Sequence, residues 1–203
     1  MIVTYALIGI TALVSWYAFS HPRLLGQLLM WPPAVSRGRE YWRMFSYGFV
    51  HADWQHLLFN MITLYFFGGA MARLIEARLG PLGFLGFYLF ALPFSILPSY
   101  LRHRNDPNYR SLGASGAVSA VLFAYILVDP WSMLLVFFVP MPAIVFAAIY
   151  VGYTIWAEHA RRDNINHSAH LWGAAYGVLF LIAMEPRVVG HFLGELSQPR
   201  FGP

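Results

Sequence analysis

Apolar residues fill most of this chain in long runs, and short polar stretches separate one run from the next. A helix needs roughly 20 mainly apolar residues to cross the hydrocarbon core of a bilayer. The runs predict six membrane-spanning helices, at about 2–19, 54–74, 82–101, 113–128, 131–156 and 168–184. We therefore expect an all-α polytopic membrane protein, with residues 1–203 in a single membrane domain.

The polar stretches predict where the chain leaves the hydrocarbon. Residues 20–53 mix helix breakers with leucines at helical intervals, which is typical of short amphipathic pieces partly embedded in the interface. Residues 102–112 have the turn chemistry of a polar loop, and the tail, about 185–203, is expected to be a short end outside the membrane. Pro140 and Pro142 should bend or break the fifth span. The fourth span is short for a full crossing, so its first residues would lie in a cavity below the membrane surface.

Composition supports this class and excludes several others. The chain is 59% hydrophobic and 11% charged, whereas soluble domains carry about 25% charged residues. It has no cysteine, which excludes disulfides, thiolate metal ligands and a cysteine nucleophile. The net charge of +4 is spread over several loops, so we expect no nucleic-acid partner.

Charge alone leaves the orientation open. The first apolar run has no basic residue before it and no small-residue cleavage site after it, so we expect a retained span rather than a signal peptide. With a cytoplasmic N-terminus, the outer loops would hold Arg23, Arg37, Arg39, Arg43, Arg102, Arg104, Arg110, Arg161 and Arg162, and the inner side Arg73, Arg78, Arg187 and Arg200. The positive-inside rule taken literally favours the reverse, although it says less about a first loop that lies in the interface.

Two residues with nucleophile and base chemistry begin separate spans. Ser115 begins the fourth span, and His170 opens the sixth. An ionisable side chain at membrane depth is costly and is read as functional by default. A neutral histidine activates a serine when the two lie within hydrogen-bond reach, so we expect Ser115 and His170 to meet in the fold.

Glycines beside these residues favour such a meeting. Gly113 and Gly116 allow tight backbone conformations and expose N–H groups at a helix start, where they would hold an oxyanion. Gly173 and Gly177 form a small-xxx-small face that lets the sixth span approach the fourth. Serine and glycine alone would more often reflect helix packing, but the added histidine favours catalysis.

A third polar cluster lies at the start of the second span. His56 and Asn60 share one helical face, and their side chains are candidates to stabilise an oxyanion, a contribution of about 3 kcal/mol for one donor. The competing interpretation is a buried polar network that ties the second span to its neighbours. We favour such a structural role for His51, Arg43 and Glu76.

Taken together, these motifs resemble the rhomboid family of intramembrane serine proteases. The resemblance rests on Trp42-Arg43, His56-x-x-x-Asn60, Gly113-Ala114-Ser115-Gly116 and Ala169-His170-x-x-Gly173-x-x-x-Gly177. It implies a six-helix bundle with a cytoplasmic N-terminus and a Ser115–His170 dyad in a cavity open to the outer side. The oxyanion would be held by His56, Asn60 and the Ser115 backbone N–H, with no metal or cofactor.

The resemblance also implies partners and moving parts. The fifth span and the loop at about 156–167 would form a movable gate and cap. The substrates would be transmembrane segments of other membrane proteins, cut near their outer ends, in contact with membrane lipid. We expect a bacterial inner (plasma) membrane location.

Two positions depart from the family pattern. Many members carry a tyrosine one turn after the nucleophile, stacked on the catalytic histidine, where this chain has Ser119. Another aromatic residue, with Trp172 as a candidate, would then have to orient His170, or nothing does. The stretch from Gly68 to Glu76 is about one turn longer than usual, which leaves the role of Glu76 open.

Three other functions compete with proteolysis. A catalytically inactive relative would bind membrane clients without cutting them. A haem protein would use His56 and His170 as axial ligands, but that leaves Ser115 and Asn60 without a purpose. A small transporter would use the same polar residues as a path, although no inverted repeat of spans is visible.

Overall fold

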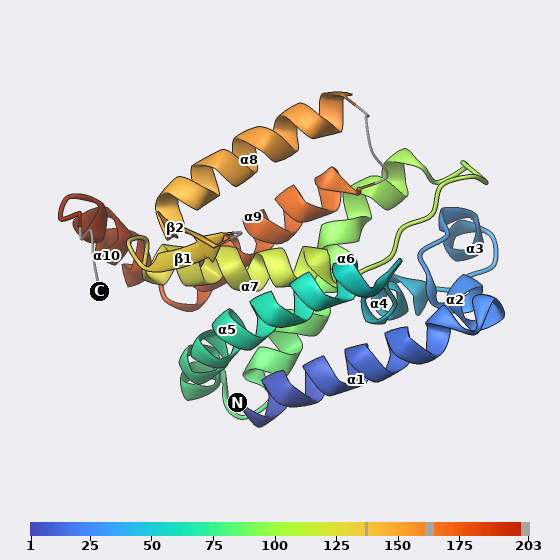
Figure 1. Cartoon of the computed structure of the whole chain (residues 1–203), viewed down its shortest axis with the longest axis horizontal. Helices are drawn as coiled ribbons and strands as arrows, with labels where there is room; N and C mark the ends of the chain where they lie inside the picture. The colour runs from blue at the N-terminus through green and yellow to red at the C-terminus, as the bar shows by residue number, and fades with distance from the viewer. Residues whose placement is uncertain (137, 161–164, 200–203) are drawn as a thin grey trace.

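The computed structural model describes residues 1–136, 138–160 and 165–199, and it is mainly helical (Figure 1). In chain order its elements are α1 (Ile2–Phe19), α2 (Pro22–Leu28), α3 (Pro32–Ser36), α4 (Arg43–Ser46), η1 (Tyr47–Phe49), α5 (Trp54–Leu79), α6 (Gly83–Arg102), α7 (Ser115–Val128), β1 (Met133–Val136), β2 (Val139–Pro142), α8 (Ala143–Ala160), α9 (His167–Met184) and α10 (Arg187–Leu196).

The long helices form a membrane bundle around α7. Within the described residues, five helices are long and apolar enough to cross a bilayer, namely α1, α5, α6, α8 and α9. Helix α7 has 14 residues, about 21 Å at 1.5 Å per residue, and it contacts α5, α6, α8, α9 and α10. Eleven of its residues are buried. The predicted all-α polytopic bundle and its short fourth span are confirmed.

The second and fifth spans differ from their predicted bounds. Helix α5 continues to Leu79 and ends at Gly80, which has a positive φ of 82°. The prediction ended this span at about Leu74, just before Glu76 and Arg78, but charged side chains can end an apolar run without ending the helix.

The predicted helix before residue 143 is wrong. Met133 to Val136 and Val139 to Pro142 instead form a two-stranded antiparallel hairpin, in which Met133 lies opposite Pro142. Pro140 and Pro142 cannot donate backbone hydrogen bonds, so they suit the edge of a small sheet rather than a helix interior. The fifth span therefore begins after these prolines instead of bending around them.

The first loop folds into short helices, as predicted for residues 20–53. Arg43 holds them together, because its guanidinium donates to the carbonyls of Gly26 and Leu29 at 2.8 Å and to the Glu40 carboxylate at 2.5 Å. Arg43 is 6% exposed. These contacts support the structural role expected for Arg43.

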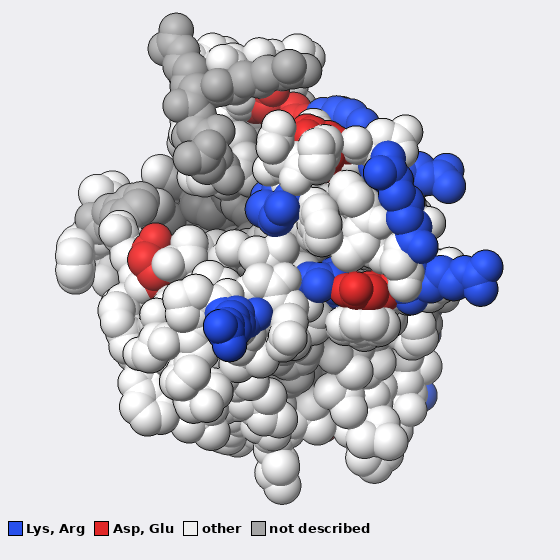
Figure 2. Space-filling view, turned by 90° about the vertical axis from the view of Figure 1, so that its right-hand side faces the viewer, with Lys and Arg blue, Asp and Glu red and all other residues white. Residues whose placement is uncertain are grey.

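The two ends of the bundle differ in character. Arginine side chains gather on the end formed by α2, α3 and the loop after α6 (Figure 2).

At the opposite end, the tail forms helix α10, which packs against α7 and α9 and so belongs to the bundle. Glu185, just before α10, pairs with Arg78 of α5 and with Arg187. Glu76 of α5 lies 3.9 Å from the amino group of Met1.

Candidate active site

The backbone at the start of α7 is shaped for a tight turn. Gly113 has a φ of +115°, a conformation that side chains other than glycine rarely adopt. An added Cβ there would lie 2.5 Å from Cε1 of the His56 ring. The chain therefore passes directly beneath His56 and enters α7 at Ser115, with Ala114 as the N-cap.

Helices α7 and α9 approach each other through the predicted glycines. A Cβ on Gly173 would lie 2.8 Å from the carbonyl carbon of Gly116, and one on Gly177 would lie 2.7 Å from that of Ala120. Both separations are well inside normal carbon–carbon contact. The expected close packing of the fourth and sixth spans is present.

This approach brings the two candidate catalytic residues together. The Ser115 Oγ lies 2.7 Å from His170 Nε2, and both residues are half-buried. A hydroxyl at hydrogen-bond distance from an imidazole is the geometry in which a histidine takes the proton of a nucleophile.

His56 and Asn60 lie one turn apart on α5, and the His56 ring reaches the turn that precedes Ser115. The His56 ring covers Gly113, two residues before Ser115. Asn60 is buried, and its Nδ2 donates to the His56 carbonyl at 2.9 Å. An amide nitrogen carries two hydrogens, so this bond leaves Asn60 with a second donor.

His51 is fully buried and braces the turn before Ser115. The Ala114 N–H donates to His51 Nε2 at 3.2 Å, and His51 Nδ1 lies 2.8 Å from Ser15 Oγ. Because the Ser15 hydroxyl donates to the Phe49 carbonyl, the proton between Ser15 and His51 belongs to Nδ1. Burial and the neighbouring His56 lower the pKa of His51 to about 3, so it stays neutral and can accept the Ala114 N–H.

The aromatic partner of His170 is Tyr150 of α8, not Trp172. The Tyr150 and His170 rings have centroids 6.3 Å apart and planes 19° apart. The Tyr150 hydroxyl lies 2.9 Å from Ser119 Oγ. Trp172 is 45% exposed and its ring lies near Phe94 instead. Sequence reasoning missed Tyr150 because its ring reaches His170 only through the way α8 docks.

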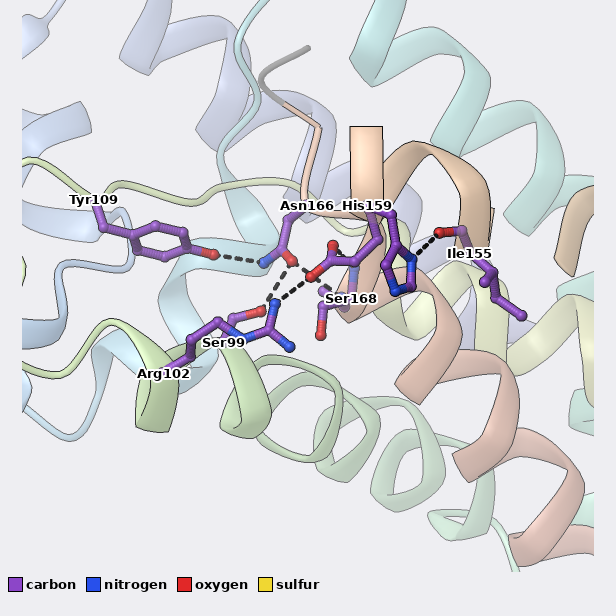
Figure 3. Close-up of polar contacts among 9 residues, drawn as sticks. Ser99, Arg102, Tyr109, Ile155, His159, Asn166 and Ser168 are labelled. Carbon is purple, nitrogen blue, oxygen red and sulfur yellow. Dashed lines mark hydrogen bonds and ion pairs between the residues drawn. The ribbon is translucent and has the colours of Figure 1, made fainter. Parts of the chain in front are cut away.

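Asn166 fixes the start of α9, and sequence reasoning missed it as well. Its Oδ1 accepts from the Ala169 N–H at 3.0 Å and from the Ser99 hydroxyl at 2.9 Å, and its Nδ2 donates to the Tyr109 hydroxyl at 2.9 Å (Figure 3). A capping residue just before an apolar run was the available signal. Asn166 thereby anchors the first turn of α9, which carries His170.

The same region ties α8 to its neighbours. The Glu158 carboxylate pairs with Arg102 at the end of α6 and accepts from the Ser168 N–H at 3.0 Å. The predicted cap at about 156–167 falls partly on residues 161–164, which lie outside the described residues, as do Arg161 and Arg162.

Comparison with known families gives a match to the Rhomboid domain over residues 38–187, which is most of the chain. The chain belongs to the rhomboid family. This confirms the resemblance drawn from the four motifs and supports a multi-pass membrane protein. The rhomboid family includes intramembrane serine proteases as well as members without activity.

Named relatives come from several compartments. The chain is 33% identical over 184 residues to RHOMBOID-like protein 12, mitochondrial, of Arabidopsis thaliana, covering 82% of this chain and 53% of that protein. It is 32% identical over 149 residues to Rhomboid-like protein 11, chloroplastic, of the same plant, covering 66% and 49%. It is 26% identical over 187 residues to Putative rhomboid protease YdcA of Bacillus subtilis, covering 82% and 80%.

The chain spans about half the length of the plant rhomboids it matches. The mitochondrial and chloroplast names do not support the narrower expectation of a bacterial inner membrane. Within the described part of the chain, no group of three or more His, Cys, Asp or Glu side chains is arranged to hold a metal ion.

Proposed function

We propose that this rhomboid is an intramembrane serine endopeptidase that cleaves transmembrane segments of other membrane proteins. The observation that carries the proposal is the 2.7 Å separation of Ser115 Oγ and His170 Nε2 across α7 and α9. Such a pair supplies a nucleophile and its base without a cofactor.

The proposed reaction has two steps. His170 takes the Ser115 proton as the hydroxyl attacks the scissile carbonyl, and it then gives that proton to the leaving amine. A water, deprotonated by His170, hydrolyses the acyl-enzyme and releases Ser115. In both steps the oxyanion would be held by the Ser115 N–H at the start of α7, by His56, and by the second Nδ2 hydrogen of Asn60.

The substrate would reach the site from the bilayer. Helix α8 is the least buried of the five long spans, with 22% of its apolar window buried against 28–44% for the others. That peripheral position supports a gate formed by α8. The N-terminus would be cytoplasmic, which leaves the arginine-rich end outside.

The test is cleavage of a test protein with one transmembrane segment, in proteoliposomes. Wild-type protein should cut it, and Ser115→Ala and His170→Ala should not, while all three remain folded. A fluorophosphonate should label wild-type protein and leave Ser115→Ala unlabelled. Turnover retained in either variant would refute the assigned roles.

The same samples separate the competing functions. An inactive client-binding rhomboid would neither cut the test protein nor react with the fluorophosphonate. A haem protein would show a Soret band that disappears in His170→Ala. The proposed protease predicts labelling and cleavage without that band.

A further inference from the structure

We propose that Tyr150 is a positioning residue that holds His170 in its reactive orientation, so that the docking of α8 sets the activity of the dyad. This inference rests on the proposed function and deepens it. It assigns to α8 a direct part in the chemistry of the site.

The ring geometry is the first support. The Tyr150 and His170 rings are nearly parallel, with planes 19° apart and centroids 6.3 Å apart. This falls within the 4.5–7 Å range of offset-stacked aromatic pairs. Phe123 of α7 and Phe146 of α8 each lie 5.5 Å from Tyr150 by ring centroids. The tyrosine ring is therefore confined by its neighbours and presents a face to the imidazole.

The phenol hydroxyl is the second support. It lies 2.9 Å from Ser119 Oγ, and Ser119 is 6% exposed. Ser119 lies four residues after Ser115, on the same face of α7. The hydrogen bond thus fixes Tyr150 relative to the helix that carries the nucleophile.

These contacts form a closed circuit through three helices. Ser115 contacts His170, His170 stacks on Tyr150, and Tyr150 bonds to Ser119, which returns the circuit to α7. An outward movement of α8 would break two of these three contacts, the stacking of Tyr150 on His170 and the hydrogen bond of Tyr150 to Ser119. His170 would then lose the stacked ring that limits its rotation from the α8 side, and it would keep its bond to Ser115 and the edge contact with the His167 ring, whose centroid is 6.1 Å away.

Helix α8 is suited to control the dyad in this way. It lies at the edge of the bundle (Figure 1) and has the smallest buried share of the five long spans, 22%. A movement of α8 therefore disturbs little of the core. A substrate that enters beside α8 would reach full turnover only when α8 returns Tyr150 to His170.

The test compares three variants with wild-type protein in proteoliposomes. Tyr150→Leu removes the ring and the hydroxyl, whereas Tyr150→Phe keeps the ring and removes only the hydroxyl. The matched control, Tyr125→Phe, removes a phenol hydroxyl from α7. Each protein is checked for folding by its resistance to SDS unfolding.

We expect Tyr150→Leu to lower kcat roughly 10- to 100-fold, as for a catalytic group misplaced by about 1 Å, with KM nearly unchanged. Tyr150→Phe keeps a ring confined by Phe123 and Phe146 but loses the bond to Ser119, so its kcat should fall between those of Tyr150→Leu and wild-type protein, and the control should match wild-type protein. The fluorophosphonate reacts with the dyad without a substrate helix, so its labelling rate should fall in Tyr150→Leu by a similar factor.

Two results would overturn the inference. One is a folded Tyr150→Leu protein that labels at the wild-type rate. The other is a loss confined to KM, which would mean that Tyr150 only contacts the substrate. Failure of the wild-type protein itself to label and cleave would instead refute the proposed function, and this inference with it.

Discussion

The spacing of α7 and α9 makes Gly173 a sensitive position. A Cβ added there would lie 2.0 Å from the Gly116 carbonyl oxygen and 2.8 Å from its carbonyl carbon, whereas non-bonded heavy atoms settle at about 3.5–4.0 Å. Helix α9 must therefore retreat by at least about 1 Å in Gly173→Ala. His170 lies one turn earlier on α9 and would move with it, which lengthens its 2.7 Å contact with Ser115 to about 3.7 Å, beyond hydrogen-bond range.

Two opposing effects decide the stability of this variant. Alanine favours a helix over glycine by about 1 kcal/mol, whereas overpacking costs about 1–3 kcal/mol. The steric term should win, because the clash is with backbone atoms that cannot rotate away. We expect a modest loss of stability and a loss of turnover near 100-fold, the effect of misplacing a catalytic group by about 1 Å.

The assay is cleavage of a single-span test protein in proteoliposomes, together with unfolding in SDS. Gly86→Ala is the matched control, because a Cβ on that α6 residue has nothing within 4 Å and should leave both quantities unchanged or slightly raise stability. A folded Gly173→Ala protein with wild-type turnover would refute the reasoning.

Two further predictions concern parts of the first loop. The pKa of His51 is lowered from 6.5 to about 3, so its contribution to stability is complete above about pH 6.5 and is lost as the pH falls towards 3. Between pH 7 and about pH 4.5, wild-type protein should lose about 2 to 3 kcal/mol more unfolding free energy than His51→Gln. Arg43→Gln leaves two carbonyls and Glu40 without their shared donor and should lower stability by about 2 kcal/mol, measured by SDS unfolding.

Each of these has a clear contrary result. Parallel pH dependence in wild-type protein and His51→Gln would show that His51 is not held neutral by the fold. Arg39→Gln, an exposed arginine of the same loop, is the control for Arg43→Gln. Equal stability of these two glutamine variants would mean that the buried contacts of Arg43 contribute little.

The sequence predicted those features that depend on one helix or on local spacing. The ends of α1 and α9 follow from their apolar runs, and the approach of α9 to α7 follows from Gly173 and Gly177. The contact between Tyr150 and His170 was not predictable, because it depends on how α8 docks. The hairpin was missed because an apolar run interrupted by prolines fits both a bent helix and a small sheet.

The bond between Ser15 and His51 has a consequence for engineering shorter versions. The family match begins at residue 38, which leaves out α1 and with it Ser15. Yet Ser15 is 2.8 Å from the ring that receives the Ala114 N–H, next to Ser115, the proposed nucleophile. A truncation to the matched segment would remove one hydrogen-bond partner of that imidazole, so the shortest version that keeps the proposed activity should include α1.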